Sequence, residues 1–205
     1  MIESLRFNTP SGMIGVDQET NTIKGYIVAA TGVFKSGRGE FDGSSLRAAY
    51  KLMKAAPNGL RSRFGHPTPH SDGLGKFLGR AKNPTLETLP DGTEVLRADL
   101  VIDPTALEMA PMGGTPLGAY VLALAKSDSG ALSSSLQLTV DREFRLDAKG
   151  RPKLDAGGQP LPPLWRPTSL LASDLVDEGD ATPALLSAAT NTRVEAAKRK
   201  LRMIA

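Results

Sequence analysis

The sequence predicts an α+β domain whose strands pair mainly in antiparallel fashion. Segments rich in β-branched and aromatic residues alternate with segments in which apolar residues have helical spacing. Hairpin signals such as Asp91-Gly92 outnumber the long crossover connections that parallel strands require. The chain has 205 residues, with 21 glycines and 15 prolines, which fits one domain with many turns.

Five segments have the composition of strands. Residues 20–34 are rich in Ile, Val, Thr and Tyr. A hairpin is expected from residues 75–89 and 91–103, because the Asp-Gly pair lies between two apolar runs. Residues 130–146 alternate between apolar and polar side chains, which predicts a half-buried strand, and residues 165–176 form the last expected strand.

Helices are expected at residues 44–56 and 117–130, with polar loops between the elements. The first has apolar residues at helical spacing, Ser44 or Ser45 as its N-cap and Pro57 after its end. Residues 147–163 are expected to form a Gly/Pro-rich loop, and no internal repeat is apparent. A turn and a short helix should follow the last strand up to residue 188.

The composition limits the chemistry that the chain can perform. It has no cysteine, so disulfides, thiolate metal sites and a cysteine nucleophile are excluded, and a nucleophile would be Ser, Thr, Lys or a carboxylate. No run of about 18 apolar residues predicts a membrane span, and the N-terminus does not have the pattern of a signal peptide. The net charge of +3 is mild, and the basic run 193–202 is interpreted as a solvated helix face.

Both histidines of the chain, His66 and His70, lie in the run RSRFGHPTPHSDGLG. Pro67 and Pro69 exclude the helix on which two histidines at this spacing would share a face. His66 ends a short strand-like run, where a histidine is well placed to act as a general base. A metal site on His66, His70 and Asp72 is an alternative, since three ligands meet the minimum for a catalytic zinc ion.

Three consecutive serines, Ser133 to Ser135, interrupt the alternating strand. Serine is uncommon inside strands, and its hydroxyl becomes a nucleophile only beside a base. Alternation places Ser133, Ser135 and Gln137 on one face and Ser134 among leucines on the other. Because a nucleophile must reach the substrate, Ser133 and Ser135 fit this role better than Ser134.

Four runs of the sequence, in this order and spacing, resemble the bacteriophage prohead (capsid maturation) proteases, which are related in fold to the herpesvirus assemblin proteases. The runs are RFGHPTPHSDGLGKFLGRAKN, LRADLVI, GALSSSLQLTV and ASDLVDEGDATPALLSA. The resemblance spans roughly residues 20–190. It implies a barrel-like, assemblin-like sheet with flanking helices, a protease domain at residues 1–190 and a basic helical tail at residues 191–205.

The resemblance also assigns roles to individual residues. The histidine of the family falls on His66, and its Leu-Ser pair falls on Leu132-Ser133, which makes Ser133 the nucleophile. Ser135 stands where the family often has glycine, so Ser135 and, less well, Ser134 remain alternatives. Asp174 falls in the closing strand of the family and is interpreted as a packing residue.

The third catalytic residue is less defined by the resemblance. In one branch of these proteases the acid precedes the histidine, which favours Asp42. The alternatives are Glu40, Asp72 and Asp99. Arg142 and backbone N–H groups of glycine-rich loops could contribute to an oxyanion hole.

The function implied is that of a serine endopeptidase that cuts scaffold protein, major capsid protein and itself during phage head maturation. It would act without a cofactor inside the immature capsid in the host cytoplasm, and would self-associate there, with no membrane or specific nucleic acid as partner. One alternative is a catalytically inactive scaffolding or assembly protein of the same ancestry. The other is a metal-dependent hydrolase on His66, His70 and Asp72.

Overall fold

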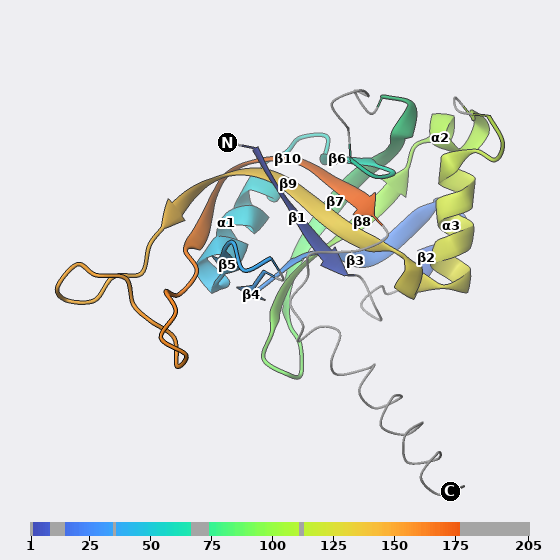
Figure 1. Ribbon diagram of the computed structural model, residues 1–205. Helices are drawn as coiled ribbons and strands as arrows, with labels where there is room; N and C mark the ends of the chain where they lie inside the picture. The colour runs from blue at the N-terminus through green and yellow to red at the C-terminus, as the bar shows by residue number, and fades with distance from the viewer. Residues whose placement is uncertain (1, 9–14, 35, 67–73, 111–112, 177–205) are drawn as a thin grey trace, which may run out of the picture.

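The computed structural model describes residues 2–8, 15–34, 36–66, 74–110 and 113–176. These residues form an α+β domain around a curled, mixed sheet of ten strands (Figure 1). Along the sheet the strand order is β1-β9-β10-β6-β7-β8-β3-β2, and β4 and β5 attach beside this path. The predicted α+β class is confirmed, and most strand pairs are antiparallel, as expected.

The strands are, in chain order, β1 (Ile2–Asn8), β2 (Gly15–Asp17), β3 (Thr22–Ala30), β4 (Gly32–Val33), β5 (Glu40–Phe41), β6 (Leu60–Arg63), β7 (Phe77–Thr88), β8 (Glu94–Ile102), β9 (Ser133–Glu143) and β10 (Leu164–Val176). All five segments predicted as strands contain one. The strand expected over 130–146 begins only at Ser133, because a short 3-10 turn, Ser129–Ala131, precedes it.

Strand β10 is central to the sheet. It pairs antiparallel with β9 along its whole length, and it pairs in parallel with β6 and β5. The sheet curls so that β9 and β10 approach β3, which is far from them in the strand order. Two contacts connect these strands: Ser134 Oγ donates to the Ile27 carbonyl at 2.6 Å, and Tyr26 Oη lies 2.8 Å from Ser173 Oγ.

The core lies inside the curl and beneath the helices. The buried face predicted for β9 is confirmed at Ser134, Leu136 and Leu138. The strand is not half-buried at its start, however, because Ser133 and Ser135 on the other face are buried as well. Trp165 is also fully buried, and its ring packs edge-on against Phe34 with the ring centroids 4.9 Å apart.

Helix α1 (Gly43–Lys54) packs on β10 and β7 through its apolar face. Its N-cap is Asp42, whose carboxylate accepts a hydrogen bond from the Ser45 backbone N–H at 2.8 Å. The expectation that Ser44 or Ser45 caps the helix is therefore wrong. A carboxylate three residues before the free N–H group is an equally good cap, and its negative charge also interacts favourably with the positive end of the helix dipole.

Two further helices cover the other end of the sheet. Helix α3 (Leu117–Ser127), which was predicted, contacts β2 and β3. The short helix α2 (Pro104–Glu108), which contacts α3 and β7, was not predicted. It begins with proline directly after the N-cap Asp103, a pairing typical of helix starts.

The loop expected at 147–163 contains a tandem repeat. The runs LDAKGRP (146–152) and LDAGGQP (154–160) form the same turn, each closed by a bridge between its leucine and its proline. In both, the aspartate Oδ1 accepts from the backbone N–H groups two and four residues later. The expectation of no repeat is wrong because a period of eight residues is hidden within Gly/Pro-rich sequence. The two turns project from the sheet (Figure 1).

Some expectations fall on residues that the structure does not describe. The short helix expected before residue 188 and the basic tail at 191–205 lie outside the described residues. Among the residues that are described, no helix has the length and apolar character needed to span a membrane.

The core position of Leu138 leads to a stability prediction. Leu138→Ala is expected to lower the free energy of unfolding by about 2–5 kcal/mol, because it removes buried apolar atoms and leaves a cavity. Leu154→Ala is the matched control: this leucine is 58% exposed on the repeat, so its loss should change stability by about 0.5 kcal/mol or less. Urea denaturation measures both, and equal losses would contradict the assigned core.

Candidate functional site

His66 is placed by the chain that leaves strand β6. Phe64 continues from β6 as a parallel bridge to Leu175, and the Gly65 N–H donates to the Leu175 carbonyl at 2.7 Å. Gly65 has a φ of +73°, a conformation that favours glycine and turns the chain toward the face of β10. The expectation that His66 follows a strand end is confirmed.

The acid beside His66 is Asp174 on β10. The Asp174 Oδ2 atom lies 3.1 Å from His66 Nδ1, and the Asp174 side chain is completely buried. Arg63 at the end of β6 binds the same carboxylate with two hydrogen bonds, from Nε at 2.9 Å and from Nη2 at 2.8 Å. The Arg63 backbone N–H adds a third at 3.1 Å. A buried carboxylate needs such partners, because it has lost its hydration.

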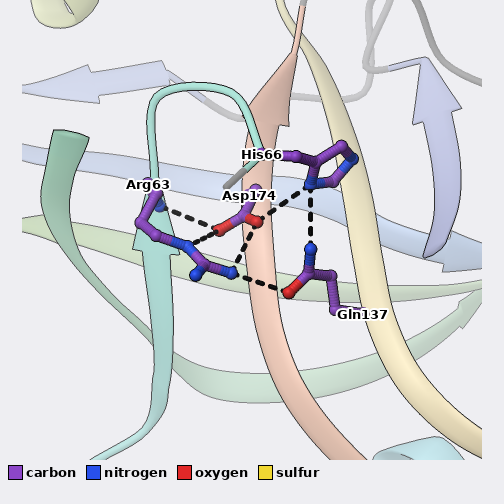
Figure 2. A network of polar contacts seen from close by, with 4 residues as sticks. All are labelled: Arg63, His66, Gln137 and Asp174. Atoms are coloured by element: carbon purple, nitrogen blue, oxygen red, sulfur yellow. Dashed lines mark hydrogen bonds and ion pairs between the residues drawn. The ribbon is translucent and has the colours of Figure 1, made fainter. Parts of the chain in front are cut away.

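Gln137 on β9 completes a ring of four side chains (Figure 2). Its Oε1 atom accepts a hydrogen bond from Arg63 Nη2 at 2.7 Å, and its Nε2 atom lies 3.1 Å from His66 Nδ1. Three neighbouring strands, β6, β10 and β9, thus supply Arg63, Asp174 and Gln137, and the loop after β6 supplies His66.

The strand register places two of the serines on the face of this ring. Ser135 lies opposite Asp174 and Ser133 lies opposite Val176 in the antiparallel pairing of β9 with β10. Residues that lie directly opposite each other on paired strands point to the same face of the sheet, and so do alternate residues along one strand. Ser133, Ser135 and Gln137 therefore lie on the face of Asp174.

All three serines are buried, but their hydroxyl groups have different surroundings. Ser134 Oγ is directed to the core, where it binds the Ile27 carbonyl. Ser135 Oγ and His66 Nε2 are buried atoms that find no hydrogen-bond partner within the described residues. An unpaired ring nitrogen and a serine hydroxyl on the same sheet face are the groups that a proton transfer between serine and histidine uses.

A pocket of about 550 Å³ lies beside His66. Most of its lining is apolar. The lining includes Leu132, which precedes Ser133 in the chain, and Val176, which lies opposite Ser133 on β10. Phe64 and Tyr120 form one wall, with ring centroids 6.0 Å apart, and Lys76 adds a cation. The arrangement would accommodate an apolar side chain beside His66.

The acids expected as third members of the site have other partners. Asp42 caps α1 and pairs with Arg166. Glu40 pairs with Arg145 at 2.7 Å, and Asp99 accepts hydrogen bonds from the Gly25 N–H and from Asn83.

The strand pairing separates Asp42 from the histidine. Glu40 pairs with Leu164 at the start of β10, whereas Asp174 is ten residues farther along this strand, roughly 30 Å. The structure therefore does not place Asp42 or Glu40 at His66. Arg142 lies over the Trp165 ring, nine residues along β9 from Ser133, so it is not placed to contribute to an oxyanion hole there.

The metal alternative falls partly on residues without a described structure. His70 and Asp72 lie outside the described residues. Within the described residues, no group of three or more His, Asp or Glu side chains is arranged to hold a metal ion.

Three residues of the ring were not predicted as functional. Asp174, which was interpreted as a packing residue, is completely buried and also contacts Arg63 and His66. A carboxylate inside the apolar run of this strand was a usable signal, because a buried acid requires polar partners. Gln137 shares the face of Ser133 in the alternation, whereas nothing in the sequence marks Arg63.

The buried ion pair gives a stability prediction. Arg63→Met should lower the free energy of unfolding by about 3–5 kcal/mol, because it leaves the Asp174 charge buried without its cation. The double variant Arg63→Met/Asp174→Leu should recover much of this loss, since no uncompensated charge remains. In the matched control Arg47→Met the broken pair with Glu94 is exposed, and a change of about 1 kcal/mol or less is expected. A small effect of Arg63→Met alone would contradict the buried pairing.

Asp42 provides a prediction with a defined pH window. Partial burial opposes ionisation, but hydrogen bonds from Arg166 and Ser45 outweigh it and lower the pKa of Asp42 from 3.8 to about 2. The ionised carboxylate therefore stabilises the fold above about pH 4, and this contribution is lost as the pH falls toward 2. Asp42→Ala should cost about 0.5–2 kcal/mol at pH 7 as a lost N-cap.

Denaturation of wild type and Asp42→Ala between pH 7 and pH 2 measures this contribution. The difference in unfolding free energy should shrink below about pH 4. Glu108→Ala, which removes an exposed carboxylate, is the control for general charge effects. A difference that stays constant to pH 2 would show that the ionised cap is not its source.

Comparison with known proteins gives no match for this chain among family models, curated proteins or solved structures.

Proposed function

We propose that this chain is a serine endopeptidase in which Ser133 is the nucleophile, His66 the general base and Asp174 the acid that orients the histidine. The observation that carries the proposal is the contact between His66 Nδ1 and the buried Asp174 carboxylate on the sheet face of Ser133. An acid bound to Nδ1 retains the proton there and leaves Nε2 free to accept a proton from serine. This is the functional unit of serine hydrolases on unrelated folds.

The reaction follows from these roles. Ser133 Oγ forms a bond to the carbonyl carbon of the scissile peptide while its proton moves to His66 Nε2. His66 then gives this proton to the departing amine as the C–N bond breaks, which leaves an acyl-enzyme. A water molecule then gives a proton to His66 and attacks the ester carbonyl carbon. The C–O bond to Ser133 breaks, His66 returns the proton to Ser133 Oγ, and the carboxyl product leaves. Asp174 stabilises the imidazolium formed in both steps and stays ionised.

The adjacent pocket supports a peptide substrate with an apolar side chain near the scissile bond. Its apolar walls would desolvate such a side chain, at a gain of about 25 cal/mol per Å² of buried apolar surface. Two residues of the pocket lining are neighbours of Ser133: Leu132 precedes it in the chain, and Val176 lies opposite it on β10.

The biological setting is proposed from the resemblance to phage prohead proteases. It assigns scaffold protein, major capsid protein and the chain itself as substrates, inside an immature capsid. It also implies that the curled sheet is an assemblin-like barrel followed by a helical tail. The order of the four sequence runs, with His66 in the first and Ser133 in the third, supports this assignment.

The test is co-expression with the capsid and scaffold proteins of the same phage, with products identified by mass spectrometry. Wild type should cleave, Ser133→Ala and His66→Ala should not, and Asp174→Asn should be slower by a factor on the order of 10⁴. Ser169→Ala, a serine on β10 that binds Thr139 Oγ1, is the matched control and should cleave like wild type.

Three results would overturn parts of the proposal. Loss of cleavage in Ser135→Ala with full cleavage in Ser133→Ala would move the nucleophile to Ser135. Full activity of Asp174→Asn would remove the orienting role of this acid. A wild type that leaves both proteins intact, and does not react with a fluorophosphonate, would favour the inactive scaffolding protein.

A further inference from the structure

The second partner of His66 Nδ1 is an amide whose orientation is fixed by an arginine. The Arg63 guanidinium has only N–H donors, so the oxygen of the Gln137 amide faces it, at 2.7 Å from Nη2. The amide nitrogen of Gln137, which is also only a donor, must then face His66 Nδ1 at 3.1 Å. Rotating the amide by 180° would place two donors against each other at Arg63.

One ring nitrogen cannot satisfy both of its neighbours. If Nδ1 carries the proton, it donates to Asp174 Oδ2, and the Gln137 amide faces it as a second donor. If the proton is on Nε2, the Nδ1 lone pair accepts from Gln137, and the Asp174 oxygen faces it as a second acceptor. Each neutral tautomer of His66 thus has one good partner and one unfavourable contact (Figure 2).

Arg63 makes the two neutral tautomers of His66 more nearly equal in free energy than they would be beside a carboxylate without a cation. Its guanidinium binds both oxygens of Asp174 and so withdraws part of the charge that attracts the Nδ1 proton. The same guanidinium holds the Gln137 amide in the orientation that donates to Nδ1. The other ionisable side chains of described residues that line the pocket with His66 are Lys76 and Tyr120, and no contact of either with Nδ1 is seen.

We propose that Gln137 is a positioning residue that maintains a population of His66 in the tautomer protonated at Nε2. This tautomer has no lone pair at Nε2, so it cannot accept the serine proton. The catalytic consequence rests on the proposed protease function, but the tautomer population does not. In the resting site Gln137 therefore lowers the fraction of molecules in which His66 can act as the base. Only molecules with the proton on Nδ1 can accept the serine proton at Nε2.

The tautomer is measured directly by two-dimensional ¹H–¹⁵N spectra that correlate the ring protons of His66 with its two nitrogens. The full chain carries His70→Gln, so that His66 is the only histidine observed. Spectra of wild type and of all variants are compared in the same buffer. Wild type should show averaged nitrogen shifts, between those of a protonated and an unprotonated ring nitrogen.

Substitutions at two positions should move the shifts in opposite directions. Gln137→Met removes the amide donor, and Gln137→Glu replaces it with an acceptor that can still bind Arg63; both should move the proton to Nδ1. Asp174→Asn should move it to Nε2. Gln159→Met, on the exposed repeat, is the matched control and should leave the shifts of His66 unchanged.

Cleavage gives a second readout that separates this proposal from the proposed function. Gln137→Met should raise kcat/KM by the reciprocal of the competent fraction measured by NMR, about twofold if half of the molecules are competent. A chain that never cleaves would count against the protease function, while the NMR result would still decide the tautomer. Wild type with the proton on Nδ1 alone, or shifts unaffected by both Gln137 variants, would overturn the proposal.

Discussion

The buried ion pair between Arg63 and Asp174 is the interaction on which the site depends. Asp174 lies on the central strand β10, with no side-chain exposure, and a carboxylate in that position is stable only with a closely bound cation or several donors. Arg63 supplies both, because its guanidinium and its backbone N–H bind the same carboxylate. His66 and Gln137 are arranged around this pair, so its geometry determines theirs.

The parallel pairing of β6 with β10 explains how this pair arises. Ala172 on β10 lies opposite Arg61 on β6, and two residues farther along the parallel strands bring Arg63 level with Asp174. One residue farther, Phe64 forms a parallel bridge with Leu175, and the turn at Gly65 then brings His66 back over β10. A shift of β6 by one residue would direct Arg63 to the opposite face and remove the ion pair.

Sequence patterns predicted the elements that are defined by local spacing. The alternation correctly predicted that Ser134, Leu136 and Leu138 face the core, although Ser133 and Ser135 on the other face are buried too. The Pro-broken run correctly predicted the position of His66 after a strand end. The apolar run around Asp174 indicates a buried acid, but local spacing could not predict that its partner is His66, because that contact depends on which strands are neighbours. Asp42 is close to His66 in sequence but lies at the other end of β10, whereas Asp174, 108 residues after His66, lies against it.

The three consecutive serines have a structural explanation that sequence periodicity alone does not provide. Ser134 points to the core, where its hydroxyl binds a carbonyl of β3 and fastens β9 to the opposite side of the curled sheet. A leucine at this position would leave that carbonyl without this donor, and the close approach of β9 to β3 would lose its polar contact. Because Ser134 holds the strand by its core-facing side, Ser133 and Ser135, which are buried on the opposite face, keep their positions relative to β10. The central serine therefore stabilises the strand position, and its neighbours are left to present hydroxyl groups to the proposed base.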